Sequence, residues 1–250
     1  MSLAAPVERL LRRTPVTAAL IGVTTAVFVL QLAIQQLAGV DLLLALGAKW
    51  GAGLRAGEVW RLVTPLFLHA GPLHLFVNMY SLFALGPVVE RFFGRPRFLA
   101  LYLMAGVSGV VLSLALSPQP SVGASGAIFG LLGALAAFLY LHRPVFGPGG
   151  EMMLRQLLIV GAINLAYGAL SQSGTADAFG PRIDLWGHVG GLAAGAACAT
   201  TFGPHLTPVL ADGGRAGLAD GRPWRDVRTR VLIAGLGLAA AAAVAVLVGA

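Results

Sequence analysis

Seven apolar runs dominate this sequence, and most of them are long enough to cross a lipid bilayer as an α-helix. A hydrocarbon core of about 30 Å requires about 20 helical residues. With 57% hydrophobic and 11% charged residues, the chain also lacks the polar surface that a water-soluble domain requires. The sequence therefore predicts an all-α polytopic membrane protein.

The apolar runs divide the chain into a core and a separate last helix. We expect spans at about residues 16–37, 73–89, 98–116, 125–141, 152–170, 185–202 and 231–250. Residues 1–15 are then a cytosolic N-terminal stub. Residues 16–203 form a six-span core, and its outer loop at about 38–72 is expected to lie in the membrane interface. Residues 204–230 are expected to form a cytosolic linker to the seventh transmembrane helix.

The basic residues predict how the chain is oriented. Thirteen arginines fall on one side of the predicted membrane, and only Lys49, Arg55, Arg61 and Arg182 fall on the other. The positive-inside rule therefore puts the N-terminus in the cytoplasm. Because these residues are dispersed between apolar runs, the net charge of +7 indicates orientation and not a nucleic-acid partner. Abundant Ala, Gly and Arg with a single lysine favour a GC-rich bacterial genome, hence a bacterial inner (plasma) membrane.

No metal or cofactor is expected. The single cysteine, Cys198, lies in an apolar run, which excludes an internal disulfide and disfavours a cysteine-based zinc site. Three histidines, His69, His142 and His205, lack partners at metal-ligand spacing and are expected to be loop and interface residues.

Ser125 is the candidate nucleophile. It follows Gly123-Ala124 and opens a short run, residues 125–141, which as a helix spans only about 25 Å. If the inner end of this helix is fixed at the cytoplasmic surface, Ser125 lies below the outer surface. Non-helical backbone at that depth is tolerated where water reaches it, so a water-filled depression is expected there. Taken alone, a serine at a helix start is more often an N-cap.

His188 is the candidate base, because ionisable residues inside spans are rare and often functional. Two runs carry glycines spaced four apart, which allows close helix packing. If these faces meet, Ser125 and His188 lie within hydrogen-bonding reach, as activation of a serine hydroxyl requires. The glycines are Gly126 and Gly130 on one helix, and Gly187, Gly191 and Gly195 on the other.

His74 and Asn78 are the candidate oxyanion donors. They lie one helical turn apart near the outer end of the second span, so they share a face. Together with the backbone N–H of Ser125 they could stabilise a developing oxyanion. Asp184 lies one turn before His188 and could orient it as a triad acid. We favour a role as an acid at the helix N-terminus instead.

These motifs, in this order, resemble the rhomboid family of intramembrane serine proteases. The similarity comprises Gly-Ala-Ser-Gly at residues 123–126, His74-xxx-Asn78, the Gly-His-xxx-Gly pattern at residues 187–191, Trp60-Arg61, and Gly86-xxx-Glu90-Arg91. It implies a six-helix bundle, with the seventh helix that some members carry. It also implies a Ser125–His188 dyad without an acidic third member, and an oxyanion hole lined by His74 and Asn78.

The resemblance further implies that single-pass transmembrane proteins are the substrates and that no cofactor is used. One departure is Phe129, where well-known bacterial members have a tyrosine packed on the catalytic histidine. The phenyl ring can pack there but offers no hydroxyl.

Two other functions use the same residues. One is a protease-inactive relative that binds membrane helices, although such relatives usually lack the serine or the histidine. The other is a small-solute transporter using the polar depression, although the sequence shows no internal repeat of the kind that transporters often have.

Overall fold

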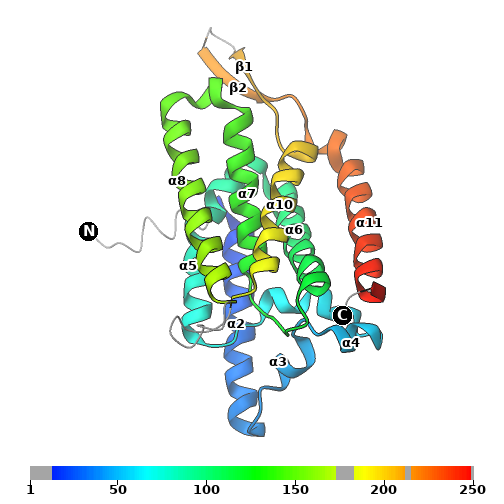
Figure 1. Cartoon of the computed structure of the whole chain (residues 1–250). Coiled ribbons are helices and arrows are strands. Elements are labelled where there is room, and N and C mark those ends of the chain that lie inside the picture. Colours follow the sequence, from blue (N-terminus) through cyan, green and yellow to red (C-terminus); the bar gives the residue numbers. More distant parts are fainter. Residues whose placement is uncertain (1–12, 173–182, 212–214, 249–250) are drawn as a thin grey trace, which may run out of the picture.

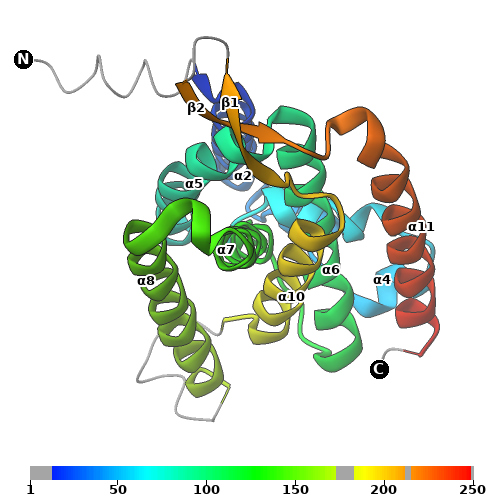
Figure 2. The same ribbon diagram turned by 90° about the horizontal axis from the view of Figure 1, so that it is seen from above.

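The computed structural model describes residues 13–172, 183–211 and 215–248. Long helices run side by side and alternate in direction, with one of them, α7, in the middle of the bundle when it is seen from above (Figure 1 and Figure 2). The long helices are α2 (Pro15–Ala38), α5 (Pro72–Phe93), α6 (Arg95–Leu116), α7 (Ser125–Leu141), α8 (Arg143–Leu170), α10 (Leu185–Phe202) and α11 (Trp224–Val248). This arrangement confirms the predicted all-α polytopic membrane fold.

Five helices in the described part of the chain have the length and hydropathy of membrane spans: α2, α5, α6, α8 and α11. Helix α7 is apolar but shorter, at 17 residues. Its side chains are apolar on every face, and most are buried, as expected of a helix enclosed by others. Helix α11 is the opposite case, since large apolar side chains such as Leu236 and Leu247 are exposed. Such a surface is suited to lipid.

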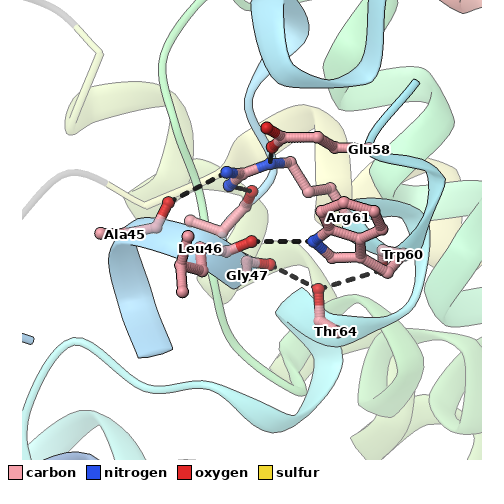
Figure 3. A network of polar contacts seen from close by, with 8 residues as sticks. Ala45, Leu46, Gly47, Glu58, Trp60, Arg61 and Thr64 are labelled. Carbon is pink, nitrogen blue, oxygen red and sulfur yellow. Dashed lines mark hydrogen bonds and ion pairs between the residues drawn. The ribbon is translucent and has the colours of Figure 1, made fainter. Parts of the chain in front are cut away.

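The loop between α2 and α5 is structured. It contains α3 (Leu42–Gly47), α4 (Gly51–Arg55) and two 3₁₀ helices, η1 (Val59–Leu62) and η2 (Thr64–Phe67). Its carbonyl groups are hydrogen-bonded by side chains from within the loop (Figure 3). Arg61 donates to the carbonyls of Ala45 and Ala48 at 3.0 and 2.8 Å, and Trp60 donates to that of Leu46 at 2.9 Å.

These bonds satisfy the last carbonyls of α3, which have no partner within the helix. Arg61 also forms an ion pair with Glu58, and only 2% of Arg61 is exposed. Trp60 and Arg61 therefore hold the loop in one shape.

The opposite end of the bundle is closed by two contacts. Glu90, near the end of α5, accepts hydrogen bonds from the backbone of Val16 and from both the backbone and hydroxyl of Thr17, at 3.0, 2.7 and 2.7 Å. It thereby caps the start of α2 with a negative charge. Gly86 lies one turn earlier, against Thr17, and a Cβ there would lie 2.7 Å from the Thr17 methyl group.

Several helix boundaries differ from those expected. Helix α5 continues to Phe93, and α8 begins at Arg143 because the Pro/Gly segment is itself largely helical. Within α8, Gly147 has φ 54° and ψ −150°, which separates a short first turn from the long helix that starts at Pro148. Helix α11 begins at Trp224, seven residues before the apolar run. Its first two turns are formed by the mostly polar residues 224–230.

Within the segment expected to be a linker, residues 206–211 and 215–220 form a two-stranded hairpin. Strand β1 (Leu206–Ala211) pairs antiparallel with β2 (Arg215–Asp220). It is attached to the bundle because Arg97 donates to the Asp220 carboxylate at 2.8 Å, and the backbone N–H of Leu206 donates to His142 Nε2 at 3.0 Å. His142, expected to be a loop and interface residue, is buried at the C-cap of α7.

Candidate active site

Ser125 and His188 are in direct contact. Ser125 occupies the first turn of α7, and His188 lies one turn into α10. His188 Nε2 and Ser125 Oγ are 2.8 Å apart. The Ser125 hydroxyl does not cap its own helix, since Ala124 occupies the N-cap position and no side chain caps it. The hydroxyl is therefore held by the imidazole and not by local backbone.

Glycines bring the two helices this close. A Cβ on Gly191 would collide with the carbonyl oxygen of Gly126, and one on Gly195 with that of Gly130. The carbonyl of Gly187 lies 3.2 Å from where a Cβ on Gly126 would be. The two glycine faces anticipated from the sequence therefore pack against each other, backbone to backbone.

Phe129 lies over the histidine ring. The two ring centroids are 4.2 Å apart, and the planes are inclined by 13°. His188 is 6% exposed, and its Nδ1 atom has no hydrogen-bond partner among the described residues. Stacking and burial thus restrict rotation of the imidazole while Nε2 faces the serine.

Among the described residues, the Asp184 carboxylate makes no hydrogen bond to the His188 ring. The carboxylate accepts a hydrogen bond from the Gly187 N–H at 2.9 Å, which makes Asp184 the N-cap of α10, and it lies against Ser113. Asp184 is therefore the acid at the helix N-terminus that we favoured, and a Ser-His-Asp triad is not formed.

His74 and Asn78 lie beside the backbone that leads to Ser125. Gly123 has φ 131°, and a Cβ there would be 2.8 Å from His74 Nε2 and 3.7 Å from Asn78 Nδ2. Asn78 is buried, and its amide donates one hydrogen bond to the His74 carbonyl at 3.0 Å. Its second N–H is available to another acceptor.

The tautomer of His74 follows from its other contact. The backbone N–H of Ala70 points at His74 Nδ1 from 3.5 Å, the long limit of a hydrogen bond. An accepting Nδ1 leaves the proton on Nε2, the nitrogen beside Gly123. His74 Nε2 and the Asn78 amide thus both present N–H donors beside Gly123.

His69, expected to be a loop and interface residue, lies in the loop before α5 and is buried behind His74. Their ring centroids are 5.0 Å apart, and the backbone of His69 is paired with the Gln31 side chain at 3.1 and 3.2 Å. Burial, reinforced by His74, lowers the pKa of His69 to about 4. His69 therefore packs as a neutral ring behind the candidate oxyanion donor.

A small cavity adjoins the Ser125–His188 contact. The space open to the centre of a water molecule is about 20 Å³, which is room for about one water. Its lining includes Gly123, Ser125, Asp184, Gly187 and His188. Among the described residues, no group of three or more His, Cys, Asp or Glu side chains could hold a metal ion.

The sequence did not single out Lys49 or Ser113, which lie next to this site. Lys49 was read only as a charge that marks the outer side, yet it is 1% exposed. The signal available was that it is the single lysine in a chain with 16 arginines.

Comparison with known proteins identifies the family. The Rhomboid domain model matches residues 56–205. The rhomboid protease GluP of Bacillus subtilis is 41% identical over 164 residues, which cover 65% of this chain and 30% of that protein. Rhomboid-like protein 7 of Arabidopsis thaliana is 38% identical over 147 residues, covering 58% and 44%. Rhomboid-like protein 1 of the same plant is 40% identical over 139 residues, covering 55% and 33%.

The chain thus spans less than half the length of these relatives. The matched region extends from the outer loop to the end of α10 and contains both members of the Ser125–His188 contact. The family match, the polytopic helical fold and the placement of the site agree, and the protein belongs to the rhomboid family.

Proposed function

We propose that this protein is an intramembrane serine endopeptidase that cleaves transmembrane segments of single-pass membrane proteins near the outer face of the membrane. The observation that carries the proposal is the 2.8 Å contact between Ser125 Oγ and His188 Nε2. A hydroxyl hydrogen-bonded to an imidazole is the arrangement that makes serine nucleophilic.

The reaction uses this contact twice. Ser125 Oγ attacks the carbonyl carbon of the scissile peptide while its proton moves to His188 Nε2. His188 then protonates the leaving amine, and the peptide C–N bond breaks to leave an acyl-enzyme. A water molecule, deprotonated by His188, hydrolyses the ester and releases Ser125.

The negative charge on the tetrahedral intermediate needs donors beside Ser125. We assign this role to the backbone N–H of Ser125, His74 Nε2 and the free N–H of Asn78. Each such donor typically stabilises the transition state by about 3 kcal/mol. Support comes from the position of His74 and Asn78 beside Gly123, two residues before the nucleophile.

A transmembrane substrate presents its carbonyls inside helical hydrogen bonds. The peptide must therefore unwind locally before its carbonyl can approach Ser125. We expect preference for substrates with small residues at the cleaved bond and helix-weakening residues nearby, because both lower the cost of unwinding.

The test uses purified protein in liposomes with a panel of tagged single-span proteins. Wild type is expected to cleave at least one of them and to react with a fluorophosphonate probe. Ser125→Ala should lose both activities while keeping its thermal unfolding temperature, because it removes only the nucleophile's oxygen. His188→Ala should lose cleavage and most labelling. Labelling or cleavage retained by Ser125→Ala would falsify the assignment.

The same experiment separates the other functions. A protein that binds the tagged helices but leaves them intact and unlabelled is a helix-binding relative without protease activity. Solute flux through the liposomes without labelling would indicate a transporter.

A further inference from the structure

Lys49 is a buried cation next to the candidate active site. It lies between α3 and α4, and its ammonium group donates to Ser113 Oγ at 2.7 Å, to the Ser117 carbonyl at 3.1 Å and to the Ser113 carbonyl at 3.4 Å. All three ammonium protons therefore have acceptors. Burial lowers the pKa of Lys49, and the nearby Asp184 carboxylate acts in the opposite direction.

Ser113 connects this cation to an anion. Its hydroxyl lies 2.8 and 2.7 Å from the two carboxylate oxygens of Asp184. Since a hydroxyl can accept from an ammonium and donate to a carboxylate at once, Lys49, Ser113 and Asp184 form one hydrogen-bonded chain. Asp184 in turn caps α10 through the N–H of Gly187.

The two charges also suit the helix ends beside which they lie. Lys49 binds carbonyls in the last turn of α6, and Asp184 precedes the first turn of α10. A cation at a helix C-terminus and an anion at a helix N-terminus are each favoured by the helix dipole. The chain therefore joins the outer ends of two neighbouring helices.

The backbone of Lys49 makes a second connection. Its N–H and C=O pair with the C=O and N–H of Ser121 at 3.0 and 3.3 Å, as a single antiparallel bridge. Two residues later, the N–H of Gly123 donates to the Pro65 carbonyl at 2.8 Å. The segment that leads into Ser125 is thus attached to the outer loop at Lys49.

We propose that Lys49, Ser113 and Asp184 act together as a positioning unit that sets the distance between Ser125 and His188, an inference that rests on the proposed function. The backbone of Lys49 fixes the segment before Ser125, and its side chain, through Ser113 and Asp184, fixes the turn of α10 that carries His188. None of the three touches the reacting atoms. Since a displacement of about 1 Å can cost about 100-fold in rate, a link between the two catalytic elements matters.

The experiment compares Lys49→Met, Asp184→Asn and the double variant. Asparagine retains the N-cap acceptor, so Asp184→Asn removes mainly the charge. The rate is measured as kcat per Ser125 labelled once the fluorophosphonate reaction has gone to completion, a count that excludes misfolded protein and does not depend on the labelling rate. We expect each single variant to lose about tenfold or more in this kcat at unchanged KM. We expect the kcat of the double variant to equal that of the less active single variant, because the two residues act as one unit.

The matched control is Arg97→Gln. Arg97 is another buried cation, at the opposite end of α6, where it pairs with Asp220 at 2.8 Å. Its loss is expected to lower the unfolding temperature and to leave kcat per reactive serine unchanged. A role that was only structural would make Lys49→Met behave in the same way, and that result would overturn the proposal. Independent, multiplicative losses in the double variant would also overturn it.

Hydrogen exchange supplies a readout that needs no catalysis. In Lys49→Met, or in the milder Ser113→Ala if the former does not fold, backbone amides in residues 118–124 and 185–188 are both expected to exchange faster. Unchanged exchange at 185–188 would contradict the link to α10. If wild type neither cleaves nor labels, the proposed function fails, and the exchange data still decide whether the two segments are coupled.

Discussion

Gly123 shows how one residue can determine the shape of a site. Its φ of 131° lies where side chains cause strain, and the space a Cβ would occupy is filled by the ring of His74. The glycine therefore serves two purposes. It permits the turn into α7, and it lets the candidate oxyanion donors approach the backbone before Ser125.

Gly123→Ala should consequently impair the site more than the fold. We expect the rate of Ser125 labelling to fall at least tenfold, because either His74 or the turn must move. A shift of about 1 Å can lower a rate by as much as about 100-fold. The matched control is Gly57→Ala, which also has a positive φ, 91°, but has no atom near the added Cβ. An unchanged labelling rate in Gly123→Ala would contradict the arrangement described for His74.

At the scale of helices, the contact between α7 and α10 decides whether a serine and a histidine 63 residues apart can meet. The contact is formed by backbone, since Gly191 and Gly195 lie directly on the carbonyls of Gly126 and Gly130. Side chains here would separate the helices and withdraw His188 from Ser125.

Gly191→Ala is therefore expected to destabilise the protein by about 1–3 kcal/mol, the usual cost of overpacking, and to abolish labelling of Ser125. Thermal unfolding in detergent and fluorophosphonate labelling measure the two effects. The control is Gly235→Ala in α11, where nothing lies within 4 Å of the added Cβ. There the substitution should be neutral or stabilising by up to about 1 kcal/mol. Equal unfolding temperatures and equal labelling of Gly191→Ala and Gly235→Ala would show that α7 and α10 do not pack this closely.

At the scale of the whole molecule, the two ends of the bundle differ. The end with α3 and α4 lies opposite the end with the hairpin and the start of α11 (Figure 1). The outer loop between α2 and α5 has three basic residues, whereas residues 215–230 alone have five. From this distribution the positive-inside rule predicts that the hairpin lies in the cytoplasm and that the site faces the outside. Arg182, one of the few basic residues assigned to the outer side, lies outside the described residues.

This orientation can be tested with single cysteines in a Cys198→Ala background, since Cys198 is the only native cysteine and is buried. Arg55→Cys in α4 and Arg225→Cys in α11 replace exposed residues at opposite ends. A membrane-impermeant maleimide added to intact cells should label the first and not the second. The reverse pattern would invert the topology and place the site on the cytoplasmic side.

Much of the fold could be predicted from the sequence because the bilayer imposes simple requirements. Apolar length locates each helix to within a few residues wherever polar ends are short, as for residues 125–141 and 185–202. It fails at α11, because residues 224–230 are helical but polar, and hydropathy does not detect them. The two strands were not predicted, because residues 204–230 are polar and were interpreted as a linker.

The sequence by itself determined the membrane fold, the helix that begins with Ser125 and the residue types that could act on a carbonyl, because these depend on composition and local spacing. Only the tertiary structure decided that His188 Nε2 faces Ser125, that the Asp184 carboxylate caps α10 without hydrogen-bonding to the His188 ring, and that Lys49 is buried against Ser113. Those facts depend on how helices pack. Packing distances of a few ångströms between residues 63 to 71 positions apart leave no trace in any local pattern.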